Sequence, residues 1–153
     1  MNILNYSLTA LASYIGLFMG FILALIAKEE IKPGKKYFLF LQKAILSAIF
    51  IILFIFLDLN YIAILLLLAC IIIYITKKKK EFNDTIYTYI LLSVIFYLSS
   101  RNINLFIIEA PLIFFYGLPT GTLLTTKDKK QTTINILKHI SFVLIAIILF
   151  LIF

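Results

Sequence analysis

Long apolar runs, separated by short polar segments, make up most of this chain. Six of them approach or exceed the length of about 20 residues that a helix needs to cross a bilayer. The six predicted spans are Tyr6 to Ala27, Tyr37 to Leu57, Tyr61 to Thr76, Phe82 to Ser99, Ile103 to Leu124 and Thr132 to Phe153. The pattern predicts an all-α integral membrane protein with about six transmembrane helices in a compact bundle. Residues 1–153 then form a single polytopic domain.

Composition supports lipid as the solvent of this chain. Hydrophobic residues make up 63% of the 153 positions, against about 45–50% in soluble domains. A single histidine and a single cysteine, Cys70, exclude an internal disulfide and a zinc site of His and Cys ligands. The chain also lacks the motifs of metalloproteases, serine hydrolases and phosphate-binding loops. We therefore expect no metal, no cofactor and no catalytic residues.

The positive charges alternate from one predicted loop to the next. The first, third and fifth loops carry Lys28, Lys32, Lys35 and Lys36, then Lys77 to Lys80, then Lys127, Lys129 and Lys130. The second loop has no Lys or Arg, and the fourth has only Arg101. The positive-inside rule places the lysine-rich loops in the cytoplasm and both termini outside, in the cell membrane. The net charge of +7 is thus explained by topology, and we expect no nucleic-acid partner.

The lipid bilayer is accordingly the first predicted partner. The run Lys77 to Lys80 lies at a membrane surface in this topology, where it could bind anionic lipid heads as well as anchor the span.

Small residues form a seam along the first span. Ala12, Gly16, Gly20 and Ala24 are each four residues apart, which places them on one helix face and allows close approach of a neighbouring backbone. The pattern predicts helix packing. The neighbour could be another copy of the chain, a larger membrane partner or another span, and Gly117 with Gly121 offers a matching seam.

The fifth span contains the most unusual stretch, Glu109 to Gly121, which reads EAPLIFFYGLPTG. Pro111 and Pro119 each lack the N–H that a helix uses, so the span is predicted to be broken or kinked. A carboxylate inside a span interrupted by Pro and Gly is typical of a transporter site. The candidate binding residues are Glu109, Pro111, Gly117, Pro119 and Gly121. The structural alternative is a kinked, packed helix whose Glu109 is protonated or paired.

Two other polar segments receive structural interpretations. Pro33-Gly34 is predicted to be a turn in the first loop. His139, beside Lys138 in the first turns of the sixth span, is interpreted as a polar helix end near the membrane interface.

Three functions remain open at this level. The favoured one is a structural or accessory membrane subunit that packs through its small-residue seams. The alternative is a small oligomeric transporter or ion-coupled carrier with Glu109 at its site, oligomeric because six spans leave only a narrow path in one copy. The second alternative is an intramembrane lipid-modifying enzyme, placed last because catalysis usually needs two cooperating polar groups.

Overall fold

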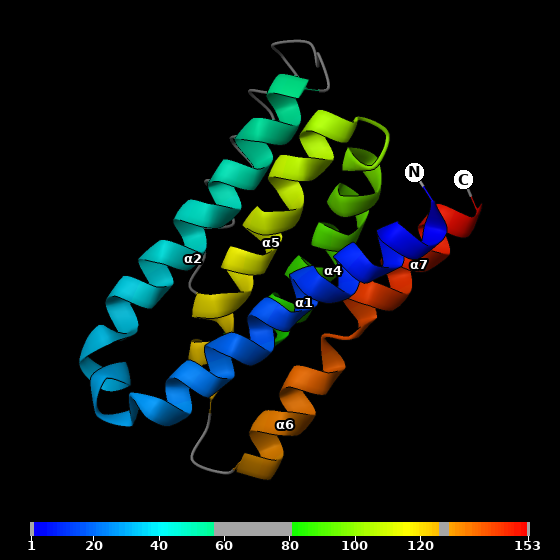
Figure 1. Cartoon of the computed structure of the whole chain (residues 1–153). Coiled ribbons are helices and arrows are strands. Elements are labelled where there is room, and N and C mark those ends of the chain that lie inside the picture. The colour runs from blue at the N-terminus through cyan, green and yellow to red at the C-terminus, as the bar shows by residue number, and fades with distance from the viewer. Residues whose placement is uncertain (1, 57–80, 126–128, 153) are drawn as a thin grey trace.

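The computed structural model describes residues 2–56, 81–125 and 129–152, and these are almost entirely helical, with no strand among them. Figure 1 shows the helices as one bundle with the two chain termini at the same end. The helices are α1 (Ile3–Ile26), α2 (Lys28–Phe56), α4 (Glu81–Ser99), α5 (Ile103–Leu123), α6 (Lys129–Lys138) and α7 (Ser141–Ile152). The predicted span Tyr61 to Thr76 and the lysine run that follows it lie outside the described residues.

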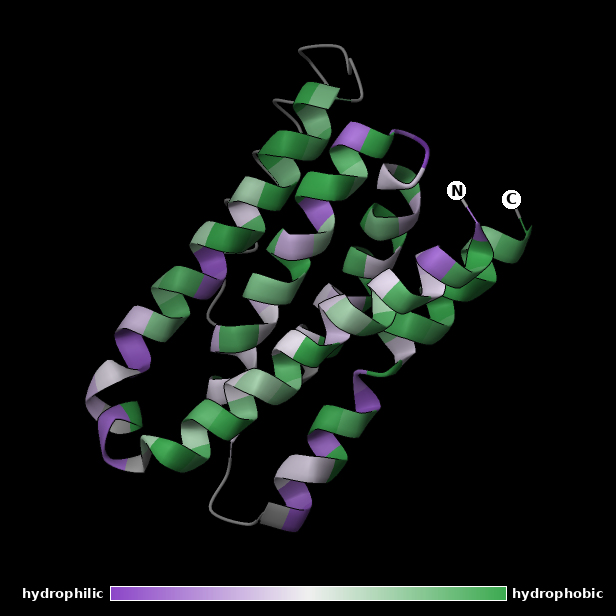
Figure 2. Cartoon of the chain, in the orientation of Figure 1, coloured by the Kyte–Doolittle hydropathy of each residue, from purple (hydrophilic) through white to green (hydrophobic). Residues whose placement is uncertain are grey.

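Four described segments are long and apolar enough to cross a membrane, as befits a membrane-embedded protein. They are Ile3–Ile26, Pro33–Phe56, Ile103–Leu123 and Lys130–Ile152. A shorter apolar helix, Thr85–Ser99, accompanies them. Figure 2 shows hydrophobic residues along most of each helix and hydrophilic residues gathered mainly towards the helix ends and connections.

The first connection differs from the prediction. Residues Lys28 to Lys36 do not form a loop, because α2 already starts at Lys28 and runs through Pro33 and Gly34. The chain turns instead at Ala27, whose N–H donates to Leu23 O at 2.9 Å while its carbonyl accepts from Glu30 N at 3.1 Å. Pro33 deprives only the carbonyl four residues earlier of a donor. That carbonyl belongs to Glu29, an exposed residue, so water can replace the lost bond.

The fifth span is not broken, because α5 is one uninterrupted helix through Pro111 and Pro119. Each proline removes one backbone donor, from the carbonyls of Ile107 and Phe115, while the bonds on either side of it persist. Side-chain hydroxyls bond other carbonyls of this helix. Thr120 donates to Tyr116 O at 2.8 Å and Thr122 donates to Pro119 O at 2.7 Å. Ser13 of α1 donates to Ala110 O at 3.0 Å.

The discontinuity lies in the sixth span, where none was predicted. α6 ends at Lys138 and α7 starts at Ser141. Between them the backbone hydrogen bonds span three residues instead of four, from His139 N to Ile136 O and from Ile140 N to Leu137 O. The two helices have 10 and 12 residues. At 1.5 Å per residue they are about 15 and 18 Å long, each about half of a bilayer core.

Contacts between the helices define their relative directions. α1 and α5 are parallel, because Ser13 bonds Ala110 and Gly20 lies against Leu118 further along both helices. α1 runs antiparallel to the α6–α7 segment, because Tyr6 donates to Ala146 O of α7 at 3.1 Å whereas Tyr14 donates to Ile136 O of α6 at 2.8 Å. α4 runs against α5, since Tyr89 contacts Tyr116 and Phe96 contacts Phe106.

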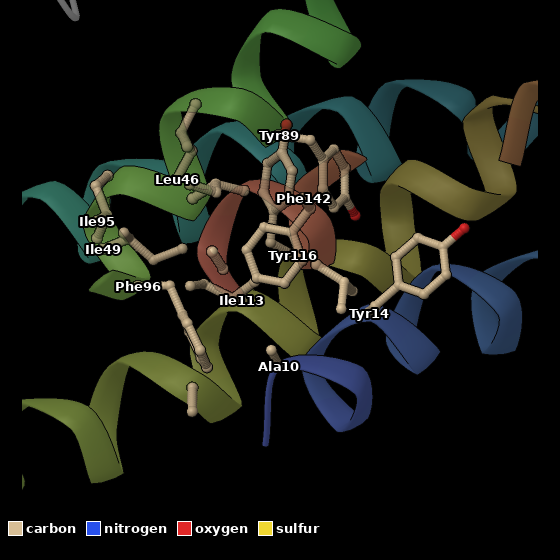
Figure 3. Packing of buried hydrophobic residues seen from close by; sticks show 14 of the residues in the cluster. Ala10, Tyr14, Leu46, Ile49, Tyr89, Ile95, Phe96, Ile113, Tyr116 and Phe142 are labelled. Carbon is tan, nitrogen blue, oxygen red and sulfur yellow. The ribbon is translucent and has the colours of Figure 1, made fainter. Parts of the chain in front are cut away.

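Aromatic side chains fill the interior between these helices. Tyr6 stacks on Phe150 with ring centroids 4.3 Å apart, and Phe96 contacts Phe106 at 5.0 Å and Phe142 at 5.6 Å. Figure 3 shows part of this core, in which Tyr89, Tyr116 and Phe142 lie close together. The outward face of α1 presents large apolar side chains of the kind that lipid tails solvate: Leu4, Leu8, Leu11, Ile15, Met19 and Ile22.

Candidate functional site

Backbone contact between α1 and α5 fixes the position of the site helix. A Cβ built on Gly16 would collide with the carbonyl of Phe114, and one on Gly20 would collide with the carbonyl of Leu118. On the α5 side, a Cβ on Gly117 would lie 2.6 Å from the Leu17 nitrogen. Both glycine pairs therefore meet within one chain, with no space left between the two backbones.

The predicted seam extends beyond these glycines at one end only. Ala24 is buried at 1% exposure, whereas Ala12 is exposed and lies outside the contact. Ser13, one position further along α1, is buried and bonds the α5 carbonyl of Ala110. The face of α1 that packs on α5 thus carries Ser13, Gly16 and Gly20. Ala12 lies outside this face.

Glu109 lies on α5 with 0% of its surface exposed. Both of its carboxylate oxygens are buried, and neither has a hydrogen-bond partner among the described residues. Gly121 and Pro119 are buried on the same helix, whereas Pro111 is exposed. The structure therefore brings the carboxylate and the second proline into the bundle but leaves the first proline on the outer surface of α5.

An unpaired carboxylate in this position is costly in either protonation state. If it is ionised, its burial costs several kcal/mol without a cation. If it is neutral, two buried oxygens still lack donors, at about 1–3 kcal/mol for each unsatisfied group. Ser13, the nearest hydroxyl along α1 to this level of α5, donates elsewhere, to the Ala110 carbonyl. Among the described residues, Glu109 has neither a cation nor a hydrogen-bond donor to offset this cost.

A second group of polar side chains lies further along the same face of α5. Glu109, Tyr116 and Thr120 are spaced by seven and four residues, which places them in one row. Gln42 of α2 reaches this row and donates to Thr120 Oγ1 at 2.9 Å and to Tyr116 Oη at 3.3 Å. Buried Ile113 separates the two polar levels. The row therefore carries a carboxylate at one level and, about 10 Å further along, two hydroxyls that accept from the Gln42 amide.

His139 occupies the discontinuity between α6 and α7, and it is fully buried. α6 ends beside it, as the prediction of a polar helix end implies, but its side chain faces the interior of the bundle. Nδ1 lies 2.7 Å from Asn135 O, and Nε2 is buried with no hydrogen-bond partner among the described residues. The Tyr89 ring packs edge-on against the imidazole at 5.0 Å and contacts the Tyr116 ring at 5.7 Å.

Sequence reasoning missed the contribution of Gln42, Tyr89 and His139 to the interior. The row on α5 was detectable, because the seven- and four-residue spacings follow one helix face. The burial of His139 left no such signal, since a histidine next to a lysine in the first turns of a span looks like a surface residue. In the part of the chain that the structure describes, no three His, Cys, Asp or Glu residues come together to hold a metal ion.

Comparisons with known proteins assign no family to this arrangement. No protein-family model, no curated protein and no solved structure matches the chain. Function must therefore be argued from the buried polar groups themselves.

Proposed function

We propose that this chain is a small ion-coupled carrier with six membrane spans, in which Glu109 binds the coupling ion, a proton in the simplest case. The observation that supports the proposal is the fully buried carboxylate of Glu109, whose two oxygens have no described partner. A carboxyl group that can exchange a proton inside a membrane is the usual element of proton relays in carriers. The discontinuous last span supplies a second feature common in transporters.

The directions of the described helices support the six-span proposal. α1 and α5 are parallel and α7 runs against them, as odd and even spans must. α2 and α4 run in the same direction (Figure 1), which is the relation expected of two spans with one predicted span between them. The lysine alternation then places both termini outside and the Ala27 turn inside.

Cysteine labelling in intact cells tests this orientation. With Cys70 replaced by alanine, Asn2→Cys should react with a membrane-impermeant maleimide, whereas Gly34→Cys should react only after the membrane is opened. The reason is that Gly34 lies among the lysines retained in the cytoplasm. Labelling of the Gly34 position from outside would reverse the proposed orientation.

Proton flux into liposomes tests the proposed function. The purified chain is reconstituted with an internal pH-sensitive dye, and a potassium diffusion potential drives protons inward. Glu109→Gln keeps the shape of the side chain and its hydrogen-bonding capacity but cannot exchange the proton, so flux should fall at least tenfold with an unchanged melting temperature. Glu29→Gln makes the same change at an exposed position and should leave flux unchanged.

Equal proton flux in Glu109→Gln and the wild type would remove Glu109 from the mechanism. Sodium and potassium gradients imposed in the same liposomes then decide whether a metal cation replaces the proton. If none of these gradients drives flux through the wild-type protein, the carrier proposal fails.

The second candidate function is a structural or accessory subunit. Because the glycines of α1 and α5 already pack against each other, a partner would have to bind another surface. The continuous apolar face of α1, with Leu4, Leu8 and Leu11 exposed, is such a surface. The lipid-modifying alternative has less support, since no described side chain lies within hydrogen-bonding distance of the Glu109 carboxylate.

A further inference from the structure

We infer that His139 is a second proton-binding group, situated at the discontinuity of the last span and connected through Tyr89 and Tyr116 to the face of α5 that carries Glu109. Its role in transport rests on the proposed function. Its ability to bind a proton does not, and can be measured separately.

The hydrogen bond of the imidazole determines which nitrogen is available. Nδ1 lies 2.7 Å from the Asn135 carbonyl. A carbonyl can only accept, so Nδ1 carries the hydrogen, and Nε2 of the neutral ring has a free lone pair. Nε2 is buried and without a described partner. The lone pair therefore has no donor in the described structure and is free to bind a proton.

The place of His139 along the membrane strengthens this inference. In the predicted span Thr132 to Phe153, His139 lies seven residues from the start, so the break falls about 10 Å inside the inner end of the span. Interrupted helices inside the membrane are where carriers bind coupling ions. A proton can reach a basic nitrogen at such a break only after the proton has entered the bundle.

Tyrosines surround the imidazole from neighbouring helices. Tyr89 of α4 contacts its ring, and Tyr14 of α1 bonds Ile136 O one turn earlier, while the adjacent Lys138 is exposed. The Tyr89 hydroxyl is buried close to Thr120, without a hydrogen bond of regular geometry in the described chain. Tyr89 Oη and His139 Nε2 are not hydrogen-bonded to each other, so a proton passes between them only through an intervening water molecule, with Oη accepting one proton as it releases its own.

Tyr116 extends the connection towards Glu109. Its ring is 5.7 Å from that of Tyr89, and its hydroxyl accepts from Gln42. It lies on the same face of α5 as Glu109, two turns away. Ring contacts thus link His139 to Tyr89 and Tyr116, and buried Ile113 separates Tyr116 from Glu109 on the same face of α5.

Nitrogen NMR tests proton binding directly, because the chain contains one histidine. With ¹⁵N-histidine incorporated and the protein in lipid nanodiscs, Nδ1 should carry the hydrogen and Nε2 should be bare at neutral pH. On acidification Nε2 should gain a proton while the protein stays folded. A neutral ring with its hydrogen on Nε2, or an Nε2 that stays bare until unfolding, would overturn the inference.

Matched variants test the connection in the liposome flux assay. His139→Gln, which cannot hold a proton in this pH range, and Tyr89→Phe, which lacks the hydroxyl, should each lower proton flux at least tenfold. Tyr87→Phe makes the same change on an exposed part of α4 and should have no effect. Melting temperatures of all three should match the wild type.

The outcomes separate the two proposals. If Glu109→Gln stops flux while His139→Gln and Tyr89→Phe do not, the His139 connection is wrong and the carrier function stands. If Glu109→Gln leaves flux intact, the proposed function fails, and the nitrogen spectra of the wild type alone decide whether His139 binds a proton.

Discussion

Replacing Gly16 by alanine will force α1 away from α5 and destabilise the protein by about 3 kcal/mol. The added methyl group would overlap the main-chain carbonyl of Phe114, which belongs to a helix and cannot rotate aside. Gly121→Ala should have a similar effect, since its Cβ would meet the Leu17 carbonyl. Leucine at either position should prevent folding. Unfolding free energies from SDS titration in mixed micelles provide the measurement.

Gly34→Ala is the matched control for this experiment. Gly34 also lies in a helix, but its Cβ would meet only the movable side chain of Phe38, at 3.2 Å. Alanine is the better helix former by about 1 kcal/mol, so this variant should be as stable as the wild type or more stable. If Gly16→Ala and Gly34→Ala have equal stabilities, α1 and α5 are not in backbone contact.

Glu109→Leu will make the protein more stable by about 1–3 kcal/mol while removing its proton flux. The substitution removes two buried oxygens without described partners and replaces them with an apolar side chain of similar size. A gain in stability with a loss of activity is expected where a polar group is kept for function at a cost to the fold. The same SDS titration measures the first effect, and the liposome assay measures the second.

A structural role for Glu109 predicts the opposite result. If the carboxyl group holds the bundle together, leucine will destabilise the protein and glutamine will rescue it. Leu112→Met, a conservative change at a half-buried position of the same helix, should alter neither stability nor flux and controls for general effects of substitution in α5.

The amino-acid sequence by itself determined that lipid surrounds this chain and that it forms long helices. The apolar excess is too large for a soluble core, and the four-residue spacing of Gly16 and Gly20 requires a close helix neighbour whatever its identity. It also revealed that the chain places a carboxylate within an apolar span. These features follow from local composition and helix periodicity, which do not depend on the other helices.

Tertiary structure decided which helix is the neighbour and where the backbone is interrupted. The two glycine pairs could have joined two copies, and only the packing of α1 on α5 places them within one chain. Local rules predicted a break or kink at Pro111 or Pro119, yet α5 continues through both, since each proline removes only one backbone donor. The break falls instead at His139, where Tyr14 bonds the Ile136 carbonyl and Tyr89 packs on the imidazole, contacts between residues far apart in the sequence.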